Sequence, residues 1–309
     1  MKLKPISQNS LYGLKDYFIE FVRLYSENSL PNKILLSGDK GVGKSTLAFH
    51  LVNYILSKNE EFEYNFNNLK INPENRSYKL ILNGSNPNFT LIDTLNEKKN
   101  IDIGQIRNLI SALNKSSFNN KERLVVIDNI ENLNMNSVNA LLKILEEPPL
   151  NTYFILINNE RFILPTLKSR CINYKIFLDY NNVINVTNKL LGEDLFKHLN
   201  IDLLNHYSTP GKLYEFINFF ETNNYDLKDL KLKELLRLII KETLYKKNEF
   251  IKNISFEYFE FFLRKNLSSI KLKSFDLYSY FIKRIDDTKK YNLDEESLFI
   301  EFENRVLNG

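Results

Sequence analysis

The chain has 309 residues, of which 43% are hydrophobic and 26% charged, proportions typical of globular proteins rather than disordered or fibrous ones. Its 42 basic and 38 acidic residues leave a net charge of +4, too balanced to indicate a nucleic-acid-binding protein by itself. One cysteine and three histidines exclude an internal disulfide and a cysteine-rich zinc site. The length predicts two or three domains. Because no leader and no run of about 18 apolar residues is found, we expect a cytoplasmic protein without membrane contact.

The first predicted strand, KILLS at residues 33–37, leads directly into a glycine-rich stretch and then into TLAFHLVNYIL, whose apolar residues repeat at helical spacing. The stretch fits G-x-x-x-x-G-K-[ST], the Walker A pattern, in which backbone N–H groups and a lysine cradle phosphates. Strand, loop and helix follow each other in the order that this chemistry needs. The sequence therefore predicts an ATP site with Mg²⁺, formed by Gly38, Asp39, Lys40, Gly41, Val42, Gly43, Lys44, Ser45 and Thr46.

A second apolar run, RLVVID at residues 123–128, ends in an acid. We expect Lys44 to reach the β and γ phosphates, and Ser45 and Asp128 to hold the magnesium ion. The next residue is Asn129, where nucleotide-hydrolysing proteins usually have a glutamate that activates water. Because an amide cannot accept a proton, little or no hydrolysis is expected. A degenerate loop that holds no nucleotide is the alternative.

The next segments continue the alternation of strands and helices. NMNSVNALLKILEEPP predicts a helix that Asn134 caps, that Pro148 and Pro149 end, and that has an apolar face at positions 138, 141, 142 and 145. YFILIN at residues 153–158 predicts another buried strand. Alternation up to about residue 178 indicates an α/β fold with a parallel sheet. The Asn-rich segment 59–88 is interpreted as a surface excursion in which KLILN, residues 79–83, could be a strand.

The rest of the chain has helical patterns only, first to about residue 222 with a turn at STPG, and then to the end as a predicted bundle. We expect the aromatic stripe of Phe256, Phe259 and Phe262 to be core. The stretch between residues 228 and 252 contains eight basic and four acidic residues. A solvated helix face is the favoured interpretation of this excess, and a surface for DNA or a partner is the alternative.

Three segments together resemble a known family: SLPNKILLSGDKGVGKSTLA, VVIDNIENLNMNSVNALLKILEEPP and LPTLKSRC. Over about residues 10–220 the chain is similar to bacterial sliding-clamp loader ATPases of the AAA+ group, and most to the delta-prime subunits of DNA polymerase III. The resemblance implies an AAA+ P-loop domain at 1–178, a small helical lid at 179–222 and an all-α collar at 223–309 that oligomerises. It also implies a role in DNA replication, with other loader subunits, the sliding clamp and primed DNA as partners.

The resemblance assigns roles to further residues. Arg170, in the triplet Ser169-Arg170-Cys171, matches the arginine finger, a catalytic residue for the ATP site of the adjacent subunit. Asn158 matches a sensor residue, and Lys212 stands where a second sensor, often arginine, is found. Lysine keeps the charge there but loses the bidentate fork. The four-cysteine zinc module common in such loaders is missing.

Three other functions stay open. A hydrolysing subunit of the gamma/tau type would carry a glutamate in place of Asn129. A P-loop kinase for small molecules would need neither the S-R-C triplet nor a separate helical collar. A purely structural subunit would leave its P-loop empty, so that nucleotide binding discriminates it from the others.

Overall fold

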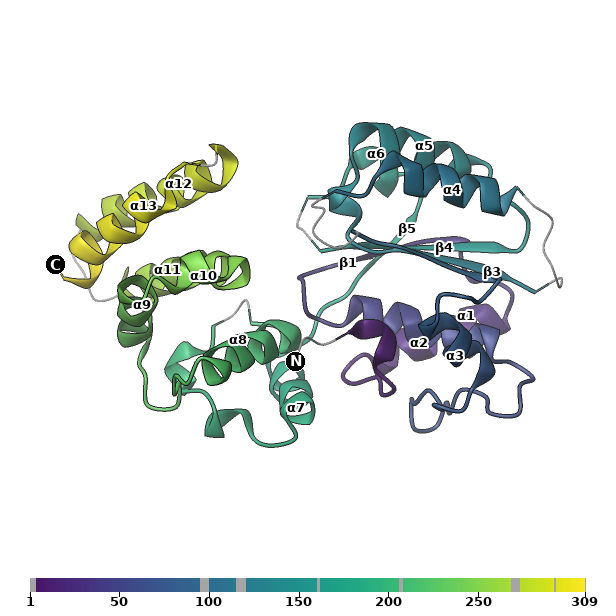
Figure 1. The fold of residues 1–309 in the computed structure, drawn as a ribbon, viewed down its shortest axis with the longest axis horizontal. Coiled ribbons are helices and arrows are strands. Elements are labelled where there is room, and N and C mark those ends of the chain that lie inside the picture. Colours follow the sequence, from purple (N-terminus) through teal and green to yellow (C-terminus); the bar gives the residue numbers. More distant parts are fainter. Residues whose placement is uncertain are drawn as a thin grey trace. The chain divides into compact units, whose positions relative to one another are not determined.

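The computed structural model describes residues 4–94, 100–114, 121–159, 162–205, 208–267, 273–291 and 293–308. Two compact units form the chain: Met1–Lys189 with Thr209–Lys212, and Leu190–Ser208 with Leu213–Gly309 (Figure 1). The predicted division into three domains stays a prediction. Within the described ranges, no helix has the length and apolar character needed to cross a membrane.

The first unit is built on a five-stranded parallel sheet in the order β2-β3-β4-β1-β5. This arrangement confirms the predicted fold class. The three strands predicted from apolar runs are present with nearly the expected bounds. The strands are β1 (Lys33–Ser37), β2 (Phe89–Ile92), β3 (Arg123–Ile127), β4 (Thr152–Asn158) and β5 (Ile172–Lys175).

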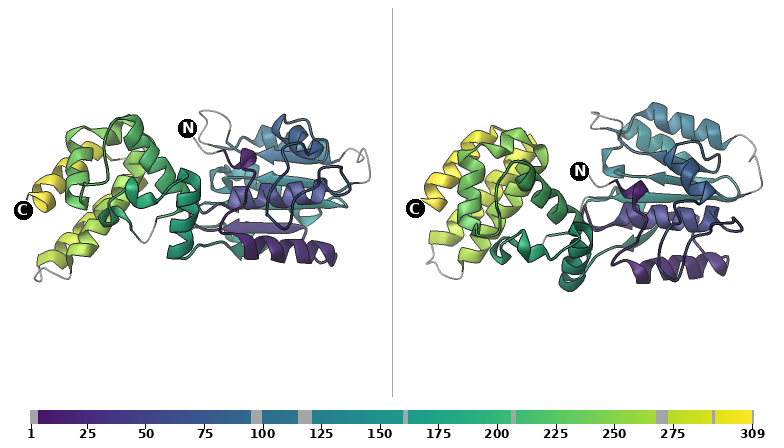
Figure 2. Two further views of the ribbon diagram at one scale, coloured as in Figure 1. Left: turned by 90° about the horizontal axis from the view of Figure 1, so that it is seen from below. Right: turned by 60° about the horizontal axis from the view of Figure 1, so that its bottom comes forward.

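Helices cover both faces of this sheet, as Figures 1 and 2 show. Alternate residues of β3 enter different cores: Leu124 and Val126 join one cluster, and Val125 joins the other. A strand buried on both faces reads as a continuous apolar run, which is why the sequence revealed it. One face carries α1 (Lys15–Ser26), α2 (Lys44–Leu56) and α3 (Arg76–Leu82), and the other α4 (Ile103–Leu113), α5 (Met135–Glu146) and α6 (Pro165–Lys168).

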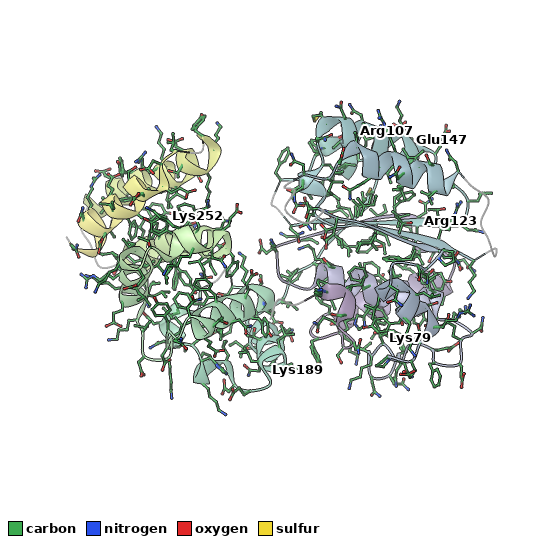
Figure 3. All side chains as sticks on the ribbon, in the orientation of Figure 1. Lys79, Arg107, Arg123, Glu147, Lys189 and Lys252 are labelled. Atoms are coloured by element: carbon green, nitrogen blue, oxygen red, sulfur yellow. The ribbon has the colours of Figure 1, made fainter. Side chains whose placement is uncertain are left out.

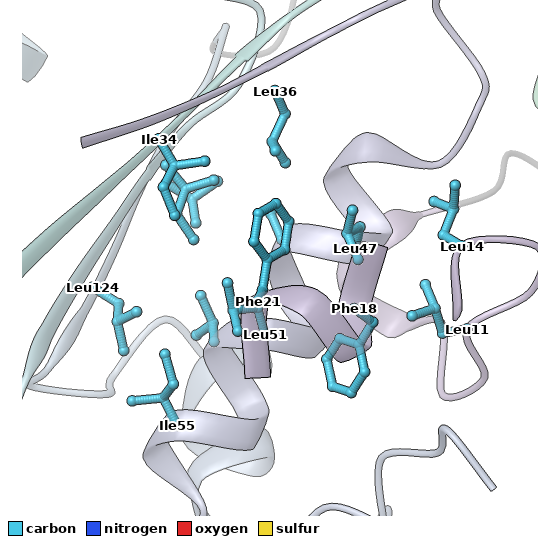
Figure 4. Close-up of a cluster of buried hydrophobic side chains, with 14 of the residues drawn as sticks. Leu11, Leu14, Phe18, Phe21, Ile34, Leu36, Leu47, Leu51, Ile55 and Leu124 are labelled. Atoms are coloured by element: carbon cyan, nitrogen blue, oxygen red, sulfur yellow. The ribbon is translucent and has the colours of Figure 1, made fainter. Parts of the chain in front are cut away.

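Helix α2, which begins at the P-loop lysine, is anchored deeply in the first cluster. Its Leu47, Leu51 and Ile55 face α1 and the sheet and are at most 3% exposed (Figure 4). Helix α5 begins as predicted, because the side chain of Asn134 accepts a hydrogen bond from the Ser137 N–H. Val138, Leu141 and Leu145 of α5 are buried in the second cluster, so both helices are fixed to the sheet by apolar burial on their inner faces.

The Asn-rich segment does not match its prediction. Lys79–Leu82 of KLILN form the end of helix α3 and Asn83 is its C-cap, so this stretch is not a strand; Asn75 caps the start of the helix by accepting from Tyr78 N. Tyr78 and Ile81, one helical turn apart, are 5% exposed and enter the core. With Tyr64 and Ile71 also in that core, the segment is more than a surface excursion. Strand β2 follows it and was not predicted, since among its residues only Ile92 is buried.

The second unit is helical. Two aromatic pairs stack in its core, Phe259 on Phe302 and Tyr245 on Phe299, each with ring centroids 3.9 Å apart. Phe256 and Phe259 are at most 2% exposed, so these two residues of the aromatic stripe are core, as predicted, whereas Phe262 is half-buried. After α7 (Tyr180–Leu191), the helices are α8 (Pro210–Thr222), α9 (Leu232–Lys241), α10 (Leu244–Lys247), α11 (Glu249–Leu267), α12 (Lys273–Tyr291) and α13 (Glu295–Phe302).

The basic residues between 228 and 252 contribute contacts to this bundle. Lys246 pairs with Glu296 at 2.7 Å, and Lys252, labelled in Figure 3, pairs with Glu295 at 2.8 Å. Arg237 donates to the backbone carbonyl of Leu307 at 2.9 Å. These contacts connect α9, α10 and α11 to the C-terminal segment, and they favour the interpretation of the stretch as a bundle surface.

Candidate functional site

The candidate site lies at one edge of the sheet, beyond the carboxyl ends of its central strands. The P-loop follows β1 and Asp128 follows β3, while β4 lies between these strands and pairs with both. Because all strands are parallel, their carboxyl ends meet at the same edge. Ligands of open α/β sheets bind outside this edge.

The glycines of the P-loop adopt backbone conformations that side chains rarely tolerate. Gly38, Gly41 and Gly43 have φ angles of +146°, +90° and +100°. A Cβ atom at Gly38 would lie 2.2 Å from the carbonyl oxygen of Ile176. Gly43 caps α2 without a side chain, so the first N–H groups of a 13-residue helix point towards the loop and can bind an anion.

Lys44 is buried inside the loop, with 2% of its surface exposed. Its Nζ donates to the carbonyl oxygens of Gly38 and Asp39, both at 2.8 Å. Burial lowers the pKa of Lys44 to about 8, and the negative charges of Asp128, Glu131 and Asp39 oppose this shift. The lysine is therefore mainly charged at neutral pH, and its two carbonyl partners hold its Nζ inside the loop.

The two predicted magnesium ligands are in direct contact. Ser45 Oγ donates to Asp128 Oδ2 at 2.5 Å. Burial raises the pKa of Asp128, the hydrogen bond from Ser45 lowers it, and the charge of Asp93 raises it further. A hydroxyl and one carboxylate are the hard oxygen donors that Mg²⁺ takes together with substrate phosphates. The residues present therefore fit this ion, although the described ranges contain no group of three or more acidic, histidine or cysteine side chains that could hold a metal without a substrate.

Both the nitrogen and the oxygen of the amide at the position of the missing base are hydrogen-bonded. Asn129 Nδ2 donates to Asp93 Oδ1 at 2.7 Å, and Asn129 Oδ1 accepts from Asn159 Nδ2 at 2.9 Å. The residue adopts a left-handed conformation with φ at +54°, which asparagine tolerates better than most residues. Its backbone N–H donates to Asp128 Oδ1 at 2.8 Å. Asn129 is therefore a structural link between neighbouring acids.

The structure brings Asn159, the residue after β4, to Asp128. Asn159 Nδ2 lies 3.3 Å from Asp128 Oδ1, and its N–H donates to Glu131 Oε2. Asn158 is 1% exposed, and its Nδ2 donates to the carbonyl oxygen of Phe162 at 3.4 Å. The sensor role of Asn158 stays a prediction. The sequence analysis did not identify Asn159 or Asp93. The available signal was a polar residue directly after a strand, since Asn159 follows β4 and Asp93 follows β2 at the carboxyl ends where ligands bind.

The turn that contains Lys212 packs directly on the P-loop. Thr209 Oγ1 donates to the carbonyl oxygen of Lys40 at 2.8 Å, and Gly211 N donates to that of Gly41 at 2.9 Å. A Cβ atom at Gly41 would lie 2.4 Å from Thr209 Oγ1, so both glycines permit this close approach. The backbone of Lys212 is thereby held beside the loop, and the sensor role of its side chain stays a prediction.

Arg170 lies at the opposite end of the strands, before the amino end of β5. The S-R-C triplet precedes β5, whose Ile172 pairs with Ile34 near the start of β1, whereas the P-loop follows the end of β1. At about 3.3 Å per residue, the four paired residues of β5 separate the two edges by roughly 13 Å of strand. Arg170 Nε donates to Glu146 Oε1 at 3.0 Å, Nη2 contacts the same oxygen, and Nη1 donates to the carbonyl oxygen of Thr166. Arg170 is therefore separated from the P-loop of its own chain.

Comparisons with known proteins agree with this architecture. The family described as "DNA polymerase III, delta subunit" matches residues 13–178. The DNA polymerase III subunit delta' of Buchnera aphidicola subsp. Baizongia pistaciae is 30% identical over 215 residues, which cover 63% of this chain and 61% of that protein, less than two thirds of its length. The subunit delta' of B. aphidicola subsp. Schizaphis graminum is 26% identical over 291 residues, 88% of this chain and 82% of that protein.

One solved structure extends the likeness of fold to nearly the whole chain. A DNA polymerase III gamma subunit-related protein from Thermotoga maritima has a TM-score of 0.51 at 19% identity and covers 92% of this chain and 96% of its own.

Proposed function

The chain belongs to the DNA polymerase III delta subunit family, and we propose that it is a clamp-loader subunit that binds ATP with Mg²⁺ and helps to place the sliding clamp on primed DNA. Other loader subunits are its proposed partners in a hetero-oligomer. The observation that carries the nucleotide part is the contact of Ser45 with Asp128 beside a buried, charged Lys44. These groups face the edge of the sheet where the P-loop turns.

Binding would exchange contacts within the loop for contacts with the nucleotide. Lys44 would leave the carbonyl oxygens of Gly38 and Asp39 for the β and γ phosphate oxygens, and the N–H groups at the start of α2 would hold the phosphate chain. Ser45 and Asp128 would hold Mg²⁺, which neutralises phosphate charge when bound. Because these groups already lie together, little rearrangement is required.

We further propose that this subunit hydrolyses ATP slowly or not at all. Asn129 cannot accept a proton, and its amide already bonds Asp93 and Asn159. Arg170 would act on the ATP site of a neighbouring subunit, because the length of the strands separates it from the P-loop of its own chain. In that complex the γ-phosphate would replace Glu146 as the anionic partner of the guanidinium.

Nucleotide binding is tested with a fluorescent ATP analogue and the purified chain. Lys44→Ala removes charge-assisted hydrogen bonds, each worth about 1.5–3 kcal/mol, so we expect affinity to fall about 10- to 100-fold or more. Lys79→Ala is the matched control, because this lysine lies on the exposed side of α3, where it pairs with Glu74 (Figure 3). Absence of binding by the wild-type chain would leave the empty-loop alternative, and equal binding by Lys44→Ala would contradict the assigned role.

The loader role is tested by reconstitution. The chain is mixed with the remaining loader subunits, the clamp and primed DNA, and formation of clamp–DNA complexes is followed with and without it. We expect loading to depend on this chain, and phosphorylation of a small molecule by the chain alone would support the kinase alternative instead.

A further inference from the structure

Asp93 is a half-buried acid next to the proposed nucleotide site, and neither the motif nor the resemblance identified it. Ile92 and Ile127 pair in the register of β2 and β3, so that Asp93 and Asp128 are the next residues of two neighbouring strands. The N–H of Thr94 donates to Asp93 Oδ1 at 2.6 Å, and Gln105 of α4 donates to the Asp93 carbonyl oxygen at 2.9 Å. Both the carboxylate and the backbone of Asp93 are thus held in place.

A chain of hydrogen bonds connects this acid to Asp128, and its direction follows from chemistry. Ionised carboxylates only accept hydrogen bonds, so the amide of Asn129 must turn its Nδ2 to Asp93 Oδ1, 2.7 Å away. The Oδ1 of Asn129 then accepts from Asn159, whose Nδ2 also contacts Asp128 Oδ1 at 3.3 Å. Two amides therefore lie between two acids, and each amide has a single allowed orientation.

In this arrangement the two carboxylate oxygens of Asp128 have different hydrogen-bond partners. Oδ1 is the side held by the Asn129 N–H and by Asn159, whereas Oδ2 faces Ser45. Oδ2 is therefore the oxygen presented towards the P-loop hydroxyl and a cation there. Outer partners of this kind orient a metal ligand, and their loss typically lowers metal affinity about 10- to 100-fold.

We propose that Asp93 is a positioning residue of the nucleotide site: through Asn129 it orients the Asp128 carboxylate, and its negative charge selects a neutral amide at position 129. This inference rests on the proposed function, since Asp128 acts there as the Mg²⁺ ligand. The type of side chain tolerated at position 129 then depends on the residue at position 93. An acid introduced at 129 alone would face the Asp93 carboxylate at hydrogen-bonding distance, where two like charges repel.

The experiment is a reciprocal exchange of the two side chains, which keeps their shapes. Asp93→Asn, Asn129→Asp and the double variant are compared with the wild-type chain for binding of a fluorescent ATP analogue, with Mg²⁺ and with EDTA. We expect Asn129→Asp to weaken Mg²⁺-dependent binding about 10- to 100-fold, with a much smaller change in EDTA. The double variant should recover most of this loss, because an asparagine at 93 can donate to a carboxylate at 129.

Thermal unfolding without nucleotide, measured on the same four proteins, gives a second double-mutant cycle beside the one for binding. Destabilisation by Asn129→Asp that Asp93→Asn reverses would support the selection by charge independently of binding. Additive effects of the two substitutions in both measurements would overturn the inference while leaving Mg-ATP binding by the wild type intact. Failure of the wild-type chain to bind Mg-ATP would instead overturn the proposed function together with the role of Asp93 in it.

Discussion

Replacing Arg170 by alanine should separate the two proposed activities of this subunit. The guanidinium precedes β5, at the edge of the sheet opposite the P-loop. We therefore expect Arg170→Ala to leave Mg-ATP binding by the isolated chain within about twofold of wild type, which corresponds to less than about 0.5 kcal/mol. In a reconstituted loader, the same substitution should lower the ATPase activity that the clamp and primed DNA stimulate.

The size of each effect follows from what Arg170 contacts. Its side chain is 32% exposed and pairs with Glu146, which is 53% exposed, so the ion pair contributes about 0–1 kcal/mol to folding. The fold should survive its loss. An arginine supplied in trans accelerates phosphoryl transfer about 10³- to 10⁵-fold, or roughly 4–7 kcal/mol of barrier. Because a loader contains several ATP sites, the total rate should fall only in part.

Two assays on the reconstituted complex test this reasoning: steady-state ATPase and the rate of clamp loading. Lys168→Ala is a suitable control, since this exposed lysine lies on α6, two residues before Arg170, and has the same charge. Arg170→Lys keeps the charge but loses the planar fork, so it should recover only part of the activity. Wild-type loading by the Arg170→Ala complex would refute the role in trans, and loss of nucleotide binding by the isolated variant would refute the assumed separation of the two edges.

Three further predictions concern chemistry and stability. The isolated chain should turn over ATP well below about 1 s⁻¹, the lower end of ordinary enzyme rates, and faster steady-state hydrolysis would show that a group other than Asn129 acts as the base. Binding of Mg-ATP should weaken as pH rises through about 8, because Lys44, whose pKa burial lowers to about 8, then loses its proton; titration at several pH values measures this, and Lys44→Ala should abolish the dependence. Burial lowers the pKa of His50 from 6.5 to about 4, so the unfolded chain binds more protons than the folded chain between these pH values. The free energy of unfolding should therefore decrease as pH falls from 6.5 to 4, by at most about 3 kcal/mol. Denaturant unfolding at several pH values measures this decrease, and His50→Phe should reduce it.

The sequence by itself determined the features that neighbouring residues specify. The P-loop could be identified because its glycines, its lysine and the start of α2 lie within a few residues of each other. The central strands β1, β3 and β4 could be identified because burial on both faces makes their residues apolar without interruption. The start of α5 was also predictable, since an asparagine cap acts on an N–H three residues away.

Tertiary structure alone decided the features that depend on distant partners. Most of KLILN folds as the end of α3, because its apolar residues pack into a core that other elements form. Strand β2 was not predicted, because only one of its residues is buried and its sequence therefore lacks the apolar run of a central strand. Asn159 contacts Asp128 because β4 and β3 are neighbours in the sheet, so that the residues after their carboxyl ends lie close together. Asp93 meets Asn129 across 36 positions of sequence, and Thr209 meets Lys40 across 169. Such contacts arise from the order of strands in the sheet and from the packing of the turn on the P-loop, which no local spacing of residues encodes.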